Sequence, residues 1–260
     1  MELPKIIELK NIIQKYSDRP NPVIENLNFV IEDKPDIGQF VVLLGNSGCG
    51  KSTLLRYISG LQSPTQGEVW INGKPRNKTD RISMVFQSYS SFPWLSVLDN
   101  VALGLTFQNI NKEEREHKAI EMIKIVGLQG HESKYAKYPN LSGGQLQRVA
   151  IARSLLFNPQ IILMDEPFGA LDINTRLKMQ DMLIDIYESK IVNPTIIFIT
   201  HDISEAVYLA EDIYIMSANP GTIRHHMPLT HLPPNRNKQL KREKIFIDTV
   251  NQIEDLMTNL

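Results

Sequence analysis

The sequence predicts an α/β fold in which a mostly parallel sheet is combined with an antiparallel β subdomain and a helical insert subdomain. Short runs of apolar, β-branched residues predict strands that are buried on both faces. These runs alternate with helix-like segments, as they do in parallel sheets. The middle of the chain shows helical periodicity instead. With 42% hydrophobic and 22% charged residues among 260, the composition is that of a globular protein with one large or two modest domains.

Two segments near the start predict antiparallel strands. Apolar and polar residues alternate in Ile6–Leu9 and again in Leu27–Ile31. Turn-forming residues occupy Ser17–Pro22, between the two segments. We therefore expect a hairpin-like pair of strands ahead of the parallel sheet.

The parallel sheet is predicted from continuous apolar runs. Phe40–Leu44 is the first of them and ends at a glycine, and Ile82–Phe86 also resembles a strand. The buried-strand pattern returns later in the chain, at Ile161–Met164, Thr195–Thr200 and Ile213–Met216.

A mainly helical insert is predicted over about residues 90–156. Asn111, with Glu114 three residues later, has the spacing of a capping box and predicts a helix start. One apolar face of that helix is formed by Ala119, Ile120, Ile123 and Val126.

The last part of the chain predicts a loop and then a helix. Residues Pro220–Asn237 include four prolines and indicate a loop. Apolar residues at heptad spacing then predict a helix whose packing, dimer-contact or regulatory role the sequence leaves open. They are Phe246, Val250, Ile253, Met257 and Leu260.

The overall composition argues against several classes of protein. The net charge of −1, from 28 basic and 29 acidic residues, gives no positive field for nucleic acid, so we expect no nucleic-acid partner. The single cysteine, Cys49, excludes an intramolecular disulfide and is typical of a reducing compartment. The first ten residues do not resemble a secretory signal, and no segment approaches the ~20 apolar residues that span a bilayer. A role at a membrane would therefore be exercised from outside the lipid.

A glycine-rich loop predicts a phosphate-binding site. It matches G-x-x-x-x-G-K-[ST] and lies between the strand that ends at Leu44 and a helical pattern over Thr53–Leu61. Backbone N–H groups and the helix dipole would bind phosphate oxygens, the lysine would reach the terminal phosphates, and the last serine would bind Mg²⁺. The alternative is a glycine-rich turn with a chance lysine. The loop consists of Gly45, Asn46, Ser47, Gly48, Cys49, Gly50, Lys51 and Ser52.

Two adjacent carboxylates, Asp165 and Glu166, follow the buried strand Ile161–Met164. Ligands of open α/β sheets bind at this edge. Asp165 is predicted to hold Mg²⁺ through its water shell, and Glu166 to polarise the water that attacks the terminal phosphorus. The alternative is a solvated turn before Pro167.

A second anion-binding helix start is predicted within Leu141–Arg148. Ser142 and Gln145 have capping-box spacing, and Gly143 and Gly144 leave backbone N–H groups open to an anion. In a head-to-tail dimer, Ser142 of one subunit would face the nucleotide held by the other. The alternative is a well-capped structural helix.

Taken together, the three motifs resemble those of the ABC ATPase family, in the order and at the separations usual there. The resemblance covers about residues 5–225 and implies a P-loop NTPase core. It implies an ABC ATPase domain over 1–235, with a nucleotide-binding core at about 1–89 and 157–225 and the helical insert at 90–156. Residues 236–260 would form a helical tail.

The resemblance also implies roles for further residues. Thr53 completes the phosphate loop, and Tyr16 resembles the aromatic residue that stacks on adenine, or is a simple strand residue. Gln87 resembles the glutamine that contacts Mg²⁺ and the attacking water; the alternative is a polar loop residue. Asp172 resembles a residue that communicates between subunits; the alternative is an ordinary helix cap. His201 resembles the switch histidine that contacts the terminal phosphate; the alternative is a structural histidine.

Further motifs are similar to those of the nitrate, sulfonate and taurine importer branch. They are Val85–Gln87, Phe92–Leu95, Pro167–Asp172 and Met216–Gly221. This branch implies ATP and Mg²⁺ as cofactors, a second ATPase subunit, transmembrane permease subunits and an extracytoplasmic solute-binding protein. It implies a peripheral position at the cytoplasmic face of the cell membrane. Phe92 and Trp94 are expected to be exposed and to contact the permease; the alternative is that they form part of the insert core. The alternatives for function are a non-transport ABC ATPase, an exporter-type ATPase and a P-loop kinase.

Overall fold

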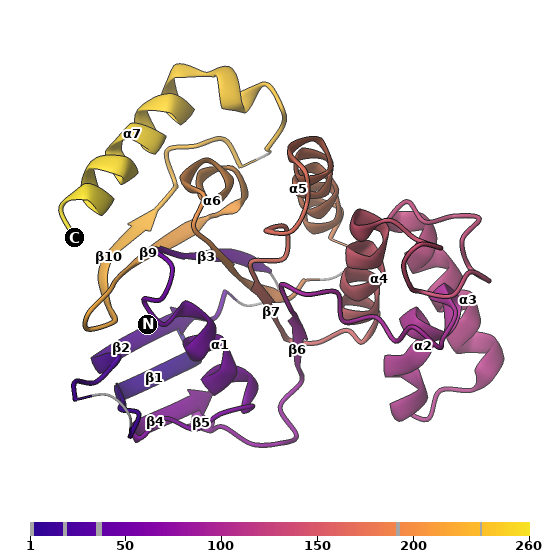
Figure 1. Ribbon diagram of the computed structural model, residues 1–260, viewed down its shortest axis with the longest axis horizontal. Coiled ribbons are helices and arrows are strands. Elements are labelled where there is room, and N and C mark those ends of the chain that lie inside the picture. Colours follow the sequence, from indigo (N-terminus) through magenta and orange to yellow (C-terminus); the bar gives the residue numbers. More distant parts are fainter. Residues whose placement is uncertain (1–2, 18–19, 35–37, 191–192, 235) are drawn as a thin grey trace. The chain divides into compact units, whose positions relative to one another are not determined.

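The computed structural model describes residues 3–17, 20–34, 38–190, 193–234 and 236–260 (Figure 1). The chain divides into two compact units. The first consists of Met1–Ile82 and Thr195–Leu260, and the second of Ser83–Pro194. No helix within the described residues is both long and apolar enough to cross a membrane.

An antiparallel sheet in the first unit confirms the prediction for the N-terminal segments. Its strand order is β2-β1-β4-β5. The Val23 N–H donates to the Gln14 carbonyl (2.8 Å) where β1 and β2 meet. Residues 18 and 19 of the predicted turn lie outside the described residues. The strands are β1 (Lys5–Gln14), β2 (Ile24–Glu32), β4 (Gln66–Ile71) and β5 (Lys74–Pro75).

The first unit also contains strands in the order β10-β9-β3-β8. Every residue of β3 is buried, as the apolar run predicted, and β3 pairs in parallel with both β8 and β9. Leu44 of β3 lies opposite Thr200 of β8, so both strands end at the same edge. The elements are β3 (Gln39–Gly45), α1 (Lys51–Ser59), β8 (Thr195–Thr200), α6 (Ile203–Leu209) and β9 (Asp212–Ser217).

The loop predicted over Pro220–Asn237 is partly wrong, because Thr222–Pro228 forms a strand, β10, antiparallel to β9. Proline is tolerated at a strand end of this kind, and Pro228 is the last residue of β10. The predicted terminal helix is present as α7 (Lys244–Thr258), after a short 3₁₀ helix, η1 (Leu240–Arg242). Phe246 and Ile253 are buried, but Leu260 lies beyond the helix end and is exposed.

The second unit has two strands and four helices among its described residues. The sheet order places β6 beside β7. Helix α2 packs against both α3 and α4. The elements are β6 (Ile82–Val85), α2 (Val97–Phe107), α3 (Lys112–Ile125), α4 (Gly143–Leu156), β7 (Ile161–Asp165) and α5 (Ile173–Glu188).

Helix α3 begins as predicted but buries a different face. The Asn111 side chain accepts a hydrogen bond from the Glu114 N–H (3.0 Å). Ile120 was predicted to be on the apolar face but is 48% exposed, and Met122 is buried instead. With Met122, the buried positions follow the i, i+3, i+4, i+7 pattern of a single helix face, which excludes position 120.

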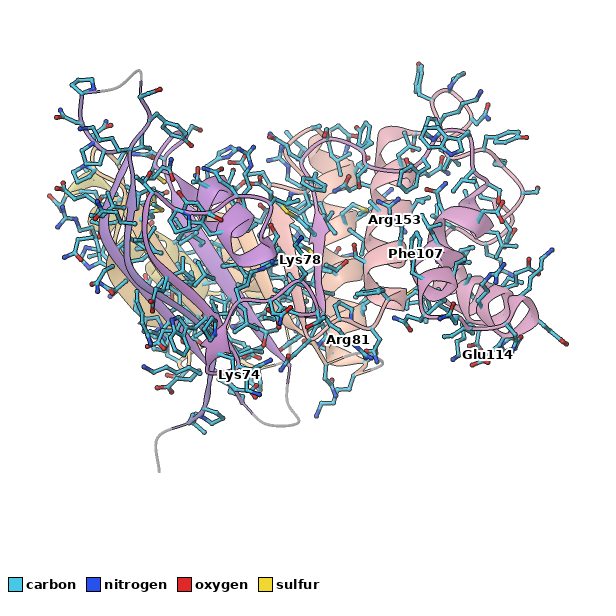
Figure 2. The ribbon with its side chains drawn as sticks, turned by 90° about the horizontal axis from the view of Figure 1, so that it is seen from below. Lys74, Lys78, Arg81, Phe107, Glu114 and Arg153 are labelled. Carbon is cyan, nitrogen blue, oxygen red and sulfur yellow. The ribbon has the colours of Figure 1, made fainter. Side chains whose placement is uncertain are left out.

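The aromatic pair after Gln87 differs in burial. Trp94 is 67% exposed, but Phe92 is half-buried, so the prediction that both rings are exposed is wrong for Phe92. The reason is Arg153 of α4, which is labelled in Figure 2. Its guanidinium lies 5.1 Å from the Phe92 ring centre and donates to the Ser90 carbonyl (2.8 Å).

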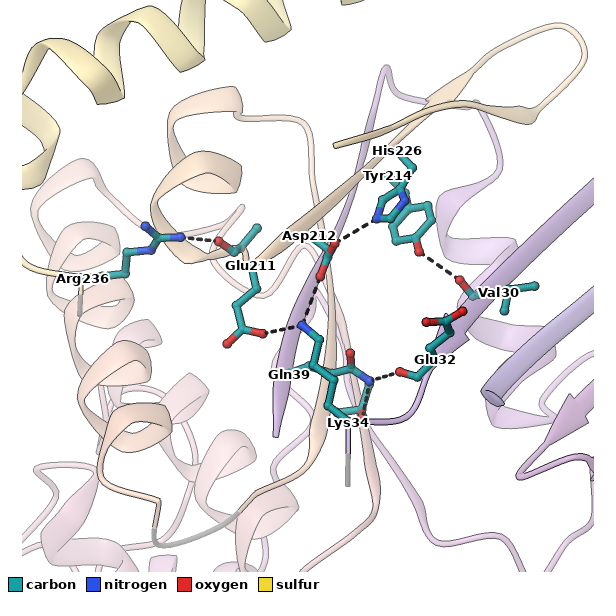
Figure 3. Close-up of polar contacts among 11 residues, drawn as sticks. Val30, Glu32, Lys34, Gln39, Glu211, Asp212, Tyr214, His226 and Arg236 are labelled. Atoms are coloured by element: carbon teal, nitrogen blue, oxygen red, sulfur yellow. Dashed lines mark hydrogen bonds and ion pairs between the residues drawn. The ribbon is translucent and has the colours of Figure 1, made fainter. Parts of the chain in front are cut away.

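A polar network joins β9, β10 and the segment before β3 in the first unit (Figure 3). The Asp212 carboxylate lies 2.9 Å from Nε2 of His226 and 3.4 Å from Nζ of Lys34. The hydrogen bond to His226 and the charge of Lys34 lower the pKa of Asp212. The His226 ring stacks on Tyr214 at 4.2 Å, and burial raises the pKa of Tyr214 to about 12. Burial alone would lower the pKa of Lys34, but Glu211 and Asp212 raise it.

This network is expected to make stability depend on pH. The pKa of Asp212 is lower in the folded chain than in the unfolded chain. The carboxylate therefore contributes to the free energy of unfolding above the unfolded pKa of about 3.9, and this contribution is lost as the pH falls through the folded pKa. Asp212→Asn is expected to lower the free energy of unfolding by roughly 1–2 kcal/mol at pH 7 and by less near pH 3. Urea titrations at both pH values measure this. Asp248→Asn, at an exposed residue of α7, is the control. Equal losses for Asp212→Asn at both pH values would contradict the assignment.

Candidate functional site

The glycine-rich loop connects β3 to α1 in the first unit. Gly50 is the residue before α1 and has a φ of 106°, an angle that residues with a side chain rarely adopt. At Gly45, an added Cβ would lie 2.6 Å from the Met216 carbonyl oxygen. The buried strand and these two glycines therefore hold Asn46, Ser47 and Gly48 at the surface, where all three are exposed.

Lys51 is buried at the start of α1, and its ammonium group turns back into the loop. Its Nζ donates to the carbonyl oxygens of Gly45 (2.8 Å) and Asn46 (3.0 Å). Ser52 and Thr53 complete the first turn and are half-buried. Cys49 is buried with its Sγ 3.9 Å from the lysine, and burial raises the pKa of its thiol, so it acts as a small packing residue.

The start of α1 suits an anion better than the starts of α2 to α6. Gly50 provides no side-chain cap, so the first-turn N–H groups receive none. By contrast, side-chain oxygens cap α2 to α6, from Ser96, Asn111, Ser142, Asp172 and Asp202. A glycine-lined loop, an uncapped helix start and a lysine together fit the phosphates of a nucleotide.

Two more predicted residues lie in the first unit. His201 directly follows Thr200, which is paired with Leu44, so His201 lies at the same sheet edge as the phosphate loop. Asp202, the next residue, caps α6 by accepting a hydrogen bond from the Glu205 N–H (2.9 Å). Tyr16 follows β1 and is 36% exposed.

The paired carboxylates lie in the second unit, at the end of β7. Asp165 is its last residue, and Glu166 has a φ of 43°. This left-handed backbone costs about 1–3 kcal/mol for a residue with a Cβ and is typical of functional turns. A Cβ added at Gly169 would lie 3.3 Å from Nε2 of Gln87 and 3.7 Å from Oε2 of Glu166. The structure therefore brings the Gln87 and Glu166 side chains to one turn.

The predicted capping box at the start of α4 is present in both halves. The Ser142 hydroxyl accepts from the Gln145 N–H (3.4 Å), and Oε1 of Gln145 accepts from the Ser142 N–H (2.9 Å). Ser142 is exposed and Gly143 is half-buried. The Tyr89 hydroxyl packs so closely on Gly143 that a Cβ there would clash with it.

Helix α5 starts beside α4. Asp172 caps α5 by accepting from the Thr175 N–H (3.0 Å), and hydrogen bonds from the Thr175 side chain and backbone lower the pKa of Asp172. A Cβ added at Gly144 would lie 2.6 Å from Cγ2 of Thr175. No sequence pattern indicated Tyr89 or Thr175, because these contacts join positions 31 or more residues apart.

The residues that would hold a divalent ion are few. Within the described part of the chain, no group of three or more His, Cys, Asp or Glu side chains gathers at one place. Mg²⁺ at nucleotide sites is usually held by one or two side chains together with phosphate oxygens and water. The Ser52 hydroxyl and the Asp165 carboxylate are donors of this kind.

The buried strand, glycine loop and lysine-led helix define a P-loop nucleotide-binding protein. The family model described as "ABC transporter" matches residues 25–169. The chain belongs to this family of ATP-binding ATPases.

Curated relatives agree with this assignment. The nitrate import ATP-binding protein NrtD of Synechocystis sp. is 43% identical, over 90% of this chain and 87% of its own length. The aliphatic sulfonates import ATP-binding protein SsuB of Bacillus cereus is 44% identical, over 88% of both chains. The taurine import ATP-binding protein TauB of Escherichia coli O157:H7 is 40% identical, over 86% and 84%. The predicted resemblance to this importer branch is confirmed.

A solved structure gives the same fold. It is a dimeric, post-hydrolysis state of the ATP-binding cassette MJ0796, bound to ADP and Pi. Its TM-score is 0.71 at 35% identity, and the match covers 86% of this chain and 98% of that one. The predicted α/β fold with a mostly parallel sheet, an antiparallel sheet and helices is therefore confirmed.

Proposed function

We propose that this chain hydrolyses MgATP to power the import of a small anion such as nitrate, a sulfonate or taurine. The observation that carries the proposal is the pair of surface helix starts, α1 without a side-chain cap and α4 with the exposed Ser142. One would bind the nucleotide of its own subunit and the other that of a second copy. The motor would lie at the cytoplasmic face of the membrane, beneath two permease subunits and an extracytoplasmic solute-binding protein.

Nucleotide binding begins with Lys51. Its ammonium group leaves the Gly45 and Asn46 carbonyls and donates to the terminal phosphates, while backbone N–H groups of the loop and of Ser52 and Thr53 hold the other oxygens. Tyr16 stacks on the base. Ser52, Gln87 and Asp165 would hold Mg²⁺, which would neutralise phosphate charge.

Hydrolysis depends on Glu166. Its carboxylate accepts a proton from the attacking water, which Gln87 orients from the same turn. His201 and Lys51 donate to the terminal phosphate oxygens and stabilise the charge that spreads over them.

A second copy completes the site. Ser142, Gly143 and Gly144 of the partner subunit direct hydrogen-bond donors at the terminal phosphate, and Asp172 lies where the two subunits exchange information. Loss of that phosphate on hydrolysis removes the bridge and lets the dimer reopen. The dimeric state of the similar MJ0796 cassette supports this arrangement.

The solute class rests on the relatives. Their names specify nitrate, aliphatic sulfonates and taurine, which all carry an oxyanion group. Selection among such solutes would occur in the other subunits, because the site described in this chain is built for a nucleotide.

The test is an affinity purification of the tagged chain from detergent-solubilised native membranes, followed by mass spectrometry. We expect a multi-span membrane protein, together with a solute-binding protein. Trp94→Ala should reduce the recovery of the membrane protein, and Leu61→Ala, at a residue 63% exposed in the first unit, should not. Recovery of soluble or nucleic-acid-associated partners alone would refute the transport role.

A further inference from the structure

A chain of hydrogen bonds in the second unit connects the loop before α4 with the capping box of α4. Nε2 of His131 lies 3.0 Å from Nε2 of Gln145, and Nδ1 of His131 lies 3.4 Å from the Gln129 carbonyl oxygen. On its other side, Oε1 of Gln145 accepts from the Ser142 N–H (2.9 Å). His131 and Gln145 are both half-buried. The imidazole therefore contacts the side chain that caps the helix start.

The chemistry of the three groups fixes the position of each proton. The Ser142 N–H can only donate, so the Gln145 oxygen faces it and the Gln145 amide nitrogen faces the imidazole. That nitrogen donates, so Nε2 of His131 must be the unprotonated acceptor. Nδ1 then carries the proton and points it at the Gln129 carbonyl. The arrangement requires a neutral His131 with its proton on Nδ1.

We propose that His131 is a positioning residue for Gln145 and keeps the capping box at the start of α4 intact only while the imidazole is neutral. A protonated Nε2 would face the two protons of the Gln145 amide. The amide would have to turn over to offer its oxygen, and the Ser142 N–H would then lose its acceptor. The inference rests on the proposed role of Ser142–Gly144 in completing the partner's site.

The loop around His131 is held in place by groups that also set its electrostatic surroundings. Arg148 of α4 donates to the Val126 carbonyl (2.5 Å), and the Glu132 carboxylate accepts from the Gly130 N–H (2.9 Å). The Lys134 N–H donates to the His131 carbonyl (3.0 Å). The charged side chains of these segments are therefore Glu132 and Lys134 on the loop and Arg148 on α4. Gly130, at a φ of 82°, allows the turn that directs the ring at α4.

Two substitutions at this position separate hydrogen bonding from titration. His131→Gln keeps an acceptor oxygen at about the place of Nε2 but cannot become charged between pH 6 and 8, whereas His131→Phe removes the acceptor. At pH 8 we expect His131→Phe to lower kcat about fivefold with little change in KM for ATP, the effect of one lost hydrogen bond. His131→Gln should stay within about twofold of the original chain.

The pH profile is the decisive readout for the ATPase. Between pH 8 and pH 6 the original chain should lose about threefold more activity than His131→Gln, because only the histidine becomes protonated. His117→Gln is the matched control, since His117 on α3 is exposed and pairs only with Glu121 among the contacts described. Its profile should follow that of the original chain. Superimposable profiles for His131→Gln and the original chain would overturn the proposal.

A direct measurement does not depend on activity. Nitrogen NMR of the full chain labelled at histidine, with the His131 signals assigned from His131→Gln, reports which ring nitrogen carries the proton. At pH 8 we expect the Nδ1–H form, and a change toward the Nε2–H form in Gln145→Ala. An Nε2–H form in the original chain would refute the hydrogen-bond direction. Failure of the proposed role of Ser142–Gly144 is recognised separately, because Glu166→Gln would then remain monomeric with MgATP while the proton of His131 would still be on Nδ1.

Discussion

Glu166→Gln is expected to leave ATP binding unchanged and to lower the turnover of ATP by roughly 10²–10⁴, the range typical of a lost general base. Glutamine keeps the size of the side chain and its place near Gln87, but it cannot accept a proton from water. Steady-state phosphate release and equilibrium binding of a labelled nucleotide measure the two effects separately.

The control for Glu166→Gln is Glu121→Gln, which makes the same chemical change at an exposed position of helix α3 and should have wild-type turnover. Thermal unfolding should be similar in both variants, apart from any change at the left-handed backbone of residue 166. Unchanged turnover in Glu166→Gln would refute the role of this carboxylate and leave the ATPase without an identified base.

Lys51→Ala is expected to weaken nucleotide binding about 10- to 100-fold, which corresponds to the charge-assisted hydrogen bonds that the ammonium group would make with phosphate. The group is already buried within the loop, so the change removes the positive charge from the site itself. Isothermal titration with ATP and with adenosine measures the effect.

The loss in Lys51→Ala should be confined to ATP, because adenosine has no phosphate. Lys74→Ala is the control, since Lys74 is an exposed residue of β5 (Figure 2). An equal loss for adenosine and ATP would indicate a damaged loop, and normal ATP binding would contradict the assignment of the phosphate site.

Most of the fold could be predicted from local patterns in the sequence. Strands β3, β7, β8 and β9 are buried over most of their residues, so their sequences are short, continuous apolar runs. Runs of this length predict buried strands. The edge strand β10 was missed because it is mostly exposed and near prolines, so it carries no apolar signal. Ile120 was misplaced because the face of a short amphipathic helix is ambiguous by one position.

The candidate site was predictable where function requires particular residue types in a fixed order. The phosphate loop and the Ser142–Gln145 capping box are of this kind, since every atom they need lies within eight residues. Contacts between distant segments were not predictable. The position of Gln87 beside Glu166, and that of His131 beside Gln145, depend on turns with positive φ angles, and no spacing rule encodes them.

The central claim is that two copies close on ATP, with Ser142 of the partner subunit completing the site. The direct measurement is the mass of Glu166→Gln in solution, by sedimentation with and without MgATP. We expect a dimer with MgATP, a monomer without it, and a monomer in both conditions when Ser142→Glu is added, because that carboxylate repels the terminal phosphate. A Glu166→Gln chain that binds MgATP and remains monomeric at all concentrations would contradict the claim.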